Sequence, residues 1–135
     1  MRRRASGLLL GAGLLLPGCG QPAVDAGPDE PATMESIAGT EFSRITLSAD
    51  AEKRLDIQTT GIRGLEGRLR LAIPYSAILY DAEGETWVYT QTEPLVFVRH
   101  AVTVDRVEGD EAVLHDGPPE GTLVVTVGSA ELYGV

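Results

Sequence analysis

The chain has few cysteines, few aromatic residues and few basic residues. Its single cysteine, Cys19, excludes any disulfide within the chain. Aromatic residues make up 5% of the 135 positions and glycine occurs 16 times, a composition that favours short strands and turns. Eleven lysines and arginines stand against twenty acids, which gives a net charge of -9. Such a surface repels phosphate backbones and anionic lipids, so we exclude nucleic-acid binding and membrane attachment through a basic patch.

Residue types that build catalytic and metal sites are also scarce. The only histidines, His100 and His115, fall on different predicted strands, so a zinc site would lack its remaining ligands. The serines and threonines have no paired base, and the sequence contains neither a G-x-S-x-G elbow nor a G-x-x-x-x-G-K loop. We therefore expect no catalytic residue, no cofactor and no metal, and we predict that the protein is not an enzyme.

Two groups of acids are better explained as turns than as ion sites. Asp81, Glu83 and Glu85 imitate the start of a calcium loop, but Thr92 stands where the closing acid belongs. A second group surrounds the predicted hairpin tip at Gly109, where charges also discourage pairing between chains. Both groups therefore predict solvated turns.

No apolar run reaches the roughly 20 residues that a membrane-spanning helix needs. The longest lies between about Ala5 and Leu16, follows three arginines and ends just before Gly18 and Cys19. A positive region, a short apolar region and a small residue at the cleavage point are typical of an export signal. We predict that residues 1–18 are a signal peptide.

The end of this segment resembles the signal of bacterial lipoproteins. Leu16, Gly18 and Cys19 match that pattern, whereas Pro17 departs from it. The resemblance implies cleavage before Cys19 and lipidation of its thiol, which is nucleophilic enough to accept a diacylglyceryl group. The protein would then be extracytoplasmic and lipid-anchored to the cell membrane, on its periplasmic side or its outer face. A plain secretory signal cut near Gly20 and a catalytic cysteine are the alternatives.

The rest of the chain divides into a tether and a domain. Residues 19–43 are rich in acids, proline and glycine without an apolar period, which predicts a disordered tether. Residues 44–135 predict a mainly β domain, a small antiparallel barrel or sandwich of about six to eight short strands. One short helix is predicted near residues 49–55, with a cap at Ser48 or Asp50. Trp87, Tyr89 and Phe97 are predicted to be core residues rather than a binding platform.

The domain resembles the membrane-proximal domain of periplasmic adaptor proteins, also called membrane fusion proteins, of resistance-nodulation-division efflux pumps. Matching features follow one another in order: a strand with Pro74, a glycine turn before Trp87-Val88-Tyr89, the Phe97-Val98-Arg99 entry to a hairpin, and a closing Val124-Val125-Thr126-x-Gly128-Ser129. The segment around residues 45–60 is similar to the part that opens these adaptors, although Asp56 stands in place of their usual glycine.

In a complete adaptor, a long insertion separates these two segments. It comprises a barrel, a lipoyl-like domain and a helical hairpin, and here only residues 62–70 join the two parts. The resemblance implies a membrane-anchored accessory of transmembrane transport that docks on a transporter permease or pump subunit. Without the hairpin, the chain would not bridge to an outer channel. The alternative is a free-standing exported ligand-binding or envelope accessory lipoprotein that shares only the fold.

Overall fold

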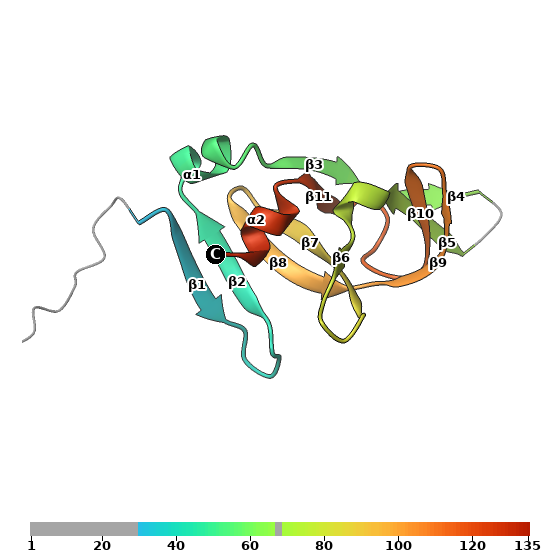
Figure 1. Ribbon diagram of the computed structural model, residues 1–135, viewed down its shortest axis with the longest axis horizontal. Helices are drawn as coiled ribbons and strands as arrows, with labels where there is room; N and C mark the ends of the chain where they lie inside the picture. The colour runs from blue at the N-terminus through green and yellow to red at the C-terminus, as the bar shows by residue number, and fades with distance from the viewer. Residues whose placement is uncertain (1–29, 67–68) are drawn as a thin grey trace, which may run out of the picture.

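The computed structural model describes residues 30–66 and 69–135, and this part of the chain is mainly β (Figure 1). The strands are β1 (Ala32–Ser36), β2 (Ser43–Leu47), β3 (Gln58–Gly61), β4 (Arg63–Leu65), β5 (Arg70–Pro74), β6 (Leu79–Tyr80), β7 (Thr86–Glu93), β8 (Val96–Ala101), β9 (Thr103–Glu108), β10 (Glu111–Asp116) and β11 (Leu123–Val127). Two short α-helices, α1 (Ala49–Arg54) and α2 (Ser129–Tyr133), and a 3-10 turn, η1 (Tyr75–Ala77), complete the fold.

The strands form two antiparallel sheets. Sheet A has the order β1-β2-β8-β7-β11-β3, with β6 paired to β7, and sheet B has the order β4-β5-β10-β9. The chain passes between the sheets at Ile62, after η1, at Val102 and in the loop before β11. In Figure 1, β1 lies at one end of the folded part and the β4–β5 hairpin lies at the other.

Sheet A has a hydrophobic core on each of its faces, because neighbouring residues of β7 and β11 point in opposite directions. Val88 and Val124 face sheet B and pack with Ile73, Leu114 and other buried residues of that sheet. Tyr89 and Val125 face the other way and pack with residues of β2, β8 and both helices. Each cluster is therefore built from distant parts of the sequence.

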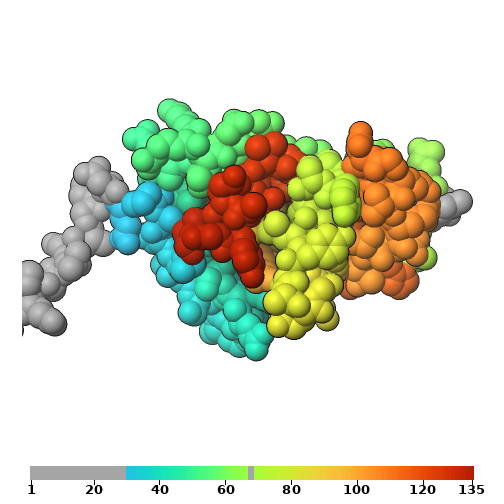
Figure 2. All heavy atoms as spheres, in the orientation of Figure 1, coloured from blue at the N-terminus to red at the C-terminus, as the bar shows by residue number. Residues whose placement is uncertain are grey.

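The second core places the C-terminus against the N-terminal half of the fold. Leu132 of α2 belongs to the same buried cluster as Ile45 of β2 and Ala51 of α1. In the space-filling view of Figure 2, the C-terminal residues (red) lie across the middle of the visible face, beside the N-terminal elements. These contacts hold α2 on the sheet, since a helix of five residues is not stable alone.

The predicted mainly β, antiparallel class is confirmed, while several details differ. The described residues contain eleven strands instead of six to eight, two α-helices instead of one, and two sheets that do not close into a barrel. The continuous β-rich sequence of residues 95–107 is divided at Val102, because β8 belongs to sheet A and β9 to sheet B. The predicted helix and its cap at Ser48 are confirmed, since the Ser48 hydroxyl accepts a hydrogen bond from the Ala51 N–H.

The predicted start of the domain at residue 44 is too late. Residues 32–36, which we assigned to the tether, form β1 and pair along their whole length with β2. The sequence of β1 shows no apolar alternation, and four of its five residues are exposed. Backbone hydrogen bonds to β2 therefore supply most of its attachment, together with the packing of Ala32 against the second core. The predicted signal peptide 1–18, Cys19 and the first part of the tether lie outside the described residues.

Candidate functional site

The most connected group of polar and aromatic side chains surrounds Arg99 on β8. The Arg99 guanidinium lies over the Trp87 ring, 4.4 Å from its centroid, and 5.3 Å from the centroid of Tyr133 in α2. Phe42, just before β2, contacts Trp87 edge-to-face with 4.9 Å between the ring centroids. Cation–π contacts of this kind contribute roughly 0.5–2 kcal/mol each. The Arg99 cluster, defined as Phe42, Trp87, Arg99 and Tyr133, thus joins β7, β8, α2 and the residue before β2.

Asp81 supplies the negative charge of this cluster. Its carboxylate accepts hydrogen bonds from Trp87 Nε1 at 2.7 Å and from the backbone N–H groups of Glu83 and Glu85, and it lies 3.6 Å from Arg99 Nη2. Partial burial alone would raise the pKa of Asp81, but these donors and the Arg99 charge outweigh it and lower the pKa. Asp81 is therefore held as a carboxylate.

Two more polar groups lie at the Arg99 cluster, the Tyr89 phenol and the Arg99 guanidinium. Tyr89 lies beneath it, and burial raises the pKa of its phenol although the Arg99 charge opposes the shift. A phenol with a raised pKa is a neutral group at physiological pH and not a base. The buried Arg99 Nε has no hydrogen-bond partner in the described part of the chain, so Arg99 is held by stacking on Trp87 and Tyr133 and by its ion pair with Asp81.

The residues singled out from the sequence do not come together into one site. His100 is exposed on β8 of sheet A, and His115 is exposed on β10 of sheet B, where it contacts Arg70. Asp81, Glu83 and Glu85 form the predicted turn, closed by a hydrogen bond from the Asp81 N–H to the Glu85 carbonyl. The described residues contain no cluster of potential metal ligands.

The predicted core aromatics are confirmed at two of three positions. Tyr89 and Phe97 are buried, whereas Trp87 is half-buried and stacks on Arg99. The sequence did not indicate that Arg99 stacks on Trp87, or that Tyr133 is the second aromatic ring beside the Arg99 guanidinium. Tyr133 is far from Arg99 in sequence, so no local pattern connects them.

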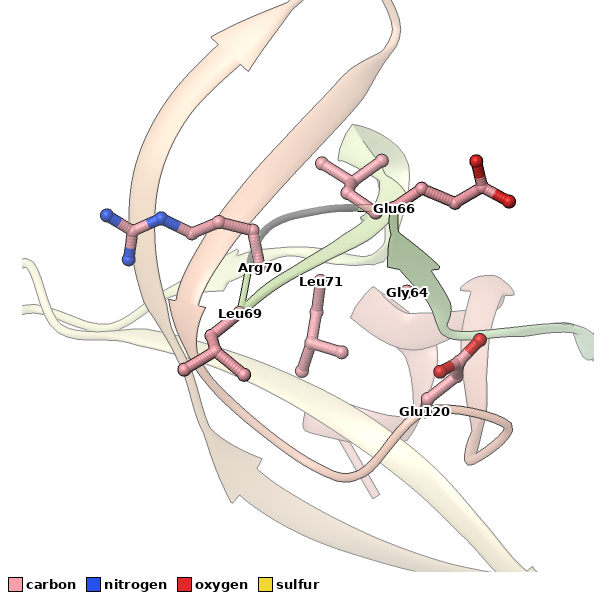
Figure 3. A pocket seen from close by; sticks show the side chains of 7 residues that line it. Gly64, Glu66, Leu69, Arg70, Leu71 and Glu120 are labelled. Carbon is pink, nitrogen blue, oxygen red and sulfur yellow. The ribbon is translucent and has the colours of Figure 1, made fainter.

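A hollow of about 440 Å³ lies at the β4–β5 end of the molecule (Figure 3). We call it the hairpin-end pocket, and its lining combines leucines with two acids: Gly64, Leu65, Glu66, Leu69, Arg70, Leu71 and Glu120. In Figure 3, Arg70 points away from the two carboxylates, toward β9 and β10. There it lies 3.9 Å from Asp105, within a row of exposed ion pairs on sheet B. Such exposed pairs contribute little to stability.

A smaller hollow of about 290 Å³ lies at the opposite end, where the described chain begins. We call it the tether-end groove, and its lining is almost entirely apolar with one charged residue: Pro31, Ala32, Leu47, Ala51, Arg54, Leu55 and Val135. Elements β1, β2, α1 and the last residue all contribute to it. Among the described residues, no helix combines the length and apolar character needed to cross a bilayer.

Searches of known protein families, curated proteins and solved structures found no match to this chain.

Proposed function

We propose that this protein is a lipid-anchored, extracytoplasmic accessory domain that docks on a transporter of the cell membrane. The support from sequence is the lipoprotein-like pattern that ends at Cys19 and the resemblance of residues 45–135 to the membrane-proximal domain of efflux adaptors. A thioether-linked lipid with several acyl chains would anchor the domain stably, since each buried methylene contributes about 0.8 kcal/mol.

The observation that carries the proposal is the position of β1, the first described element of the fold. β1 follows the segment that contains Cys19, and it lies at the end of the folded part opposite the β4–β5 hairpin (Figure 1). An anchor on Cys19 would hold the β1 end nearest the membrane. The tether-end groove lies at that same end, with a nearly apolar lining beside Arg54. We propose this groove as the docking surface for an extracytoplasmic segment of the transporter.

The anchor is tested by replacing Cys19. Cys19→Ser should abolish labelling with radioactive or clickable fatty acids and leave the precursor uncleaved, because the hydroxyl of serine is not nucleophilic enough at neutral pH to accept the lipid. The readouts are acyl labelling of the immunoprecipitated chain and its apparent mass on a gel. Labelling at the wild-type level in the variant would disprove the anchor.

Docking is tested by site-specific photocrosslinking in cells that express the full chain. A photoreactive amino acid in place of Arg54, which is exposed beside the tether-end groove, should capture an integral membrane transport protein identified by mass spectrometry. The matched control places the same amino acid at Leu69, which is fully exposed at the opposite end. Equal capture from both positions, or capture of soluble proteins alone from Arg54, would contradict docking through the groove.

A second candidate function is an exported ligand-binding lipoprotein that shares only the fold. The hairpin-end pocket favours this candidate. Its leucines would contact the alkyl part of a small organic cation, and its two carboxylates would pair with the positive charge. A panel of alkylammonium compounds should then raise the melting temperature of the wild-type chain but not of Glu120→Gln. The absence of any shift would remove this candidate.

A further inference from the structure

The outer edge of β1 is the most complete open strand edge in the described part of the chain. Bonds from the Ser48 N–H to the Pro31 carbonyl and from the Ile37 N–H to the Phe42 carbonyl fix the phase of the β1–β2 ladder. Along an antiparallel strand, the backbone N–H and C=O groups of successive residues point alternately toward the paired strand and away from it. The backbone N–H and C=O groups of Ala32, Met34 and Ser36 therefore point away from β2, and no described residue pairs with them.

The other edges of the two sheets are less suited to accept a strand. β4 has only three residues, and the β3–β11 and β9–β10 ladders each contain register irregularities. β9 also contains Asp105, Arg106 and Glu108, charges that discourage pairing. β1 is regular over five residues, contains no proline or lysine, and exposes Met34 at its centre, with 58% of the residue accessible.

We propose that β1 pairs with β1 of a second copy of this chain, antiparallel and centred on Met34. In this register Met34 lies opposite Met34 of the second copy, and Ala32 lies opposite Ser36. Because all three residues direct their backbone groups outward, the two edges match in phase and form about six hydrogen bonds. The two copies are then related by a twofold axis, the commonest symmetry of homo-oligomers.

The charges along β1 are compatible with this register. Its one charged residue, Glu35, lies opposite Thr33 of the second copy and opposite Arg44 of its own β2. No like charges face each other across the new pair, which would otherwise destabilise it. The two methionine side chains meet on the face of sheet A that carries Ala32 and the tether-end groove.

The dimer should be weak, because pairing of five-residue strands buries much less than the roughly 1,200 Å² of a standard interface. Disulfide trapping suits such a complex. In the full chain, Met34→Cys should form a disulfide between the two introduced thiols, since Cα atoms of a hydrogen-bonded pair lie about 5.5 Å apart. Ser36→Cys is the matched control, because its two copies would lie roughly 14 Å apart.

The expected result is at least about tenfold more 34-to-34 disulfide than 36-to-36 disulfide, measured by peptide mass mapping after mild oxidation. Mapping also distinguishes links through Cys19, which every variant retains. Equal yields at the two positions, or links through Cys19 alone, would overturn the proposal. The latter result is expected if residues 1–29 of the same chain cover this edge.

Proline substitution gives an independent test of the same edge. Met34→Pro removes an outward N–H that the β1–β2 ladder does not use, so the fold should remain while the dimer is lost. Thr33→Pro removes an inward N–H and should instead weaken the β1–β2 pairing. Sedimentation equilibrium of the full chain should show a concentration-dependent dimer for the wild type and a monomer for Met34→Pro. A dimer that persists in Met34→Pro would disprove pairing through β1.

Discussion

At the scale of single residues, Gly128 is a described glycine that combines a left-handed backbone with close neighbours at its missing Cβ. It precedes α2 with a φ of 84°, and a Cβ atom there would overlap Ile57 Cδ1 and lie 3.0 Å from the backbone oxygen of Leu55. The conformation disfavours any side chain, and a Cβ atom would require the Leu55 backbone and the Ile57 side chain to shift. This close contact joins the start of α2 to the segment that follows α1.

Gly128→Ala should lower the free energy of unfolding by about 2 kcal/mol or more, because backbone strain and overpacking add. Gly84→Ala is the matched control, since Gly84 has nearly the same φ, 83°, with no atom near its missing Cβ. Its cost should be about 1 kcal/mol from strain alone. Urea denaturation of both variants measures the difference, and equal losses would show that the contact with Leu55 and Ile57 is unimportant.

Asp56 is a non-glycine residue in the left-handed region, with a φ of 50°. Its carboxylate accepts a hydrogen bond from the Gln58 side chain, which compensates part of the strain. Asp56→Val should lower the free energy of unfolding by about 1–2 kcal/mol, whereas Asp56→Gly should match the wild type or exceed it. A valine variant as stable as the glycine variant would contradict this account.

The lowered pKa of Asp81 predicts a dependence of stability on pH. A carboxyl group with a lower pKa in the folded state stabilises the fold above its unfolded pKa, and that contribution is lost as the pH falls through the folded pKa. The relevant window therefore lies below about pH 4, the ordinary range of aspartate. Asp81→Asn should flatten the acid side of a melting temperature versus pH profile. An unchanged acid slope would show that other carboxylates dominate acid unfolding.

At the scale of secondary-structure elements, α1 depends on its first turn. Six residues make a marginal helix, and the Ser48 hydroxyl satisfies the Ala51 N–H at 3.1 Å. Ser48→Ala should lower the free energy of unfolding by about 1 kcal/mol, while Ser76→Ala, at an exposed serine, should change it by less than about 0.5 kcal/mol. Chemical denaturation of the two variants checks the contrast, and similar losses would rule out capping as the cause.

How far the elements could be predicted depended on whether their pattern was local. The cap at Ser48 and the turn at Asp81–Glu85 are encoded by neighbouring residues, and both were predicted. β1 was missed because its stability comes from the backbone of β2 and its side chains are mostly exposed. The break at Val102 was missed because passing from one sheet to the other is a tertiary event within a continuous β-rich sequence.

The candidate site was harder to predict for the same reason. The turn at Asp81 was predicted from its sequence. The contacts of the Asp81 carboxylate with Trp87 and Arg99 were not, because they depend on the register of β7 against β8. The tether-end groove combines residues from position 31 to position 135, which no sequence pattern brings together. The predicted lipidation of Cys19 depends on a local motif alone and stays a prediction.

At the scale of the whole molecule, one buried cluster joins the two sheets. Val88 and Val124 of sheet A pack with Ile73 and Leu114 of sheet B, and all four are almost completely inaccessible. Neither sheet can lose this contact without exposing apolar surface of the other. The described domain should therefore unfold as a single unit.

Leu114→Ala tests the cooperativity of unfolding between the two sheets. It removes a buried side chain of sheet B, while the fluorescence of the single tryptophan, Trp87, reports on sheet A. The cavity should cost about 2–5 kcal/mol. Trp87 fluorescence and far-ultraviolet circular dichroism should shift together to lower denaturant concentration. A fluorescence transition that stays at the wild-type midpoint would show that sheet A is stable without sheet B.

The β4–β5 hairpin has a consequence for how such a protein can evolve. Leu65 and Arg70 are register partners, so the chain leaves sheet B and returns to it at neighbouring positions. A guest domain whose own ends lie close together can be gained or deleted there without moving either strand. The loop-closure cost of a flexible insert rises by only about 0.6 kcal/mol for each doubling of its length. The thermodynamic barrier between a short and a greatly elongated descendant of this fold is therefore low.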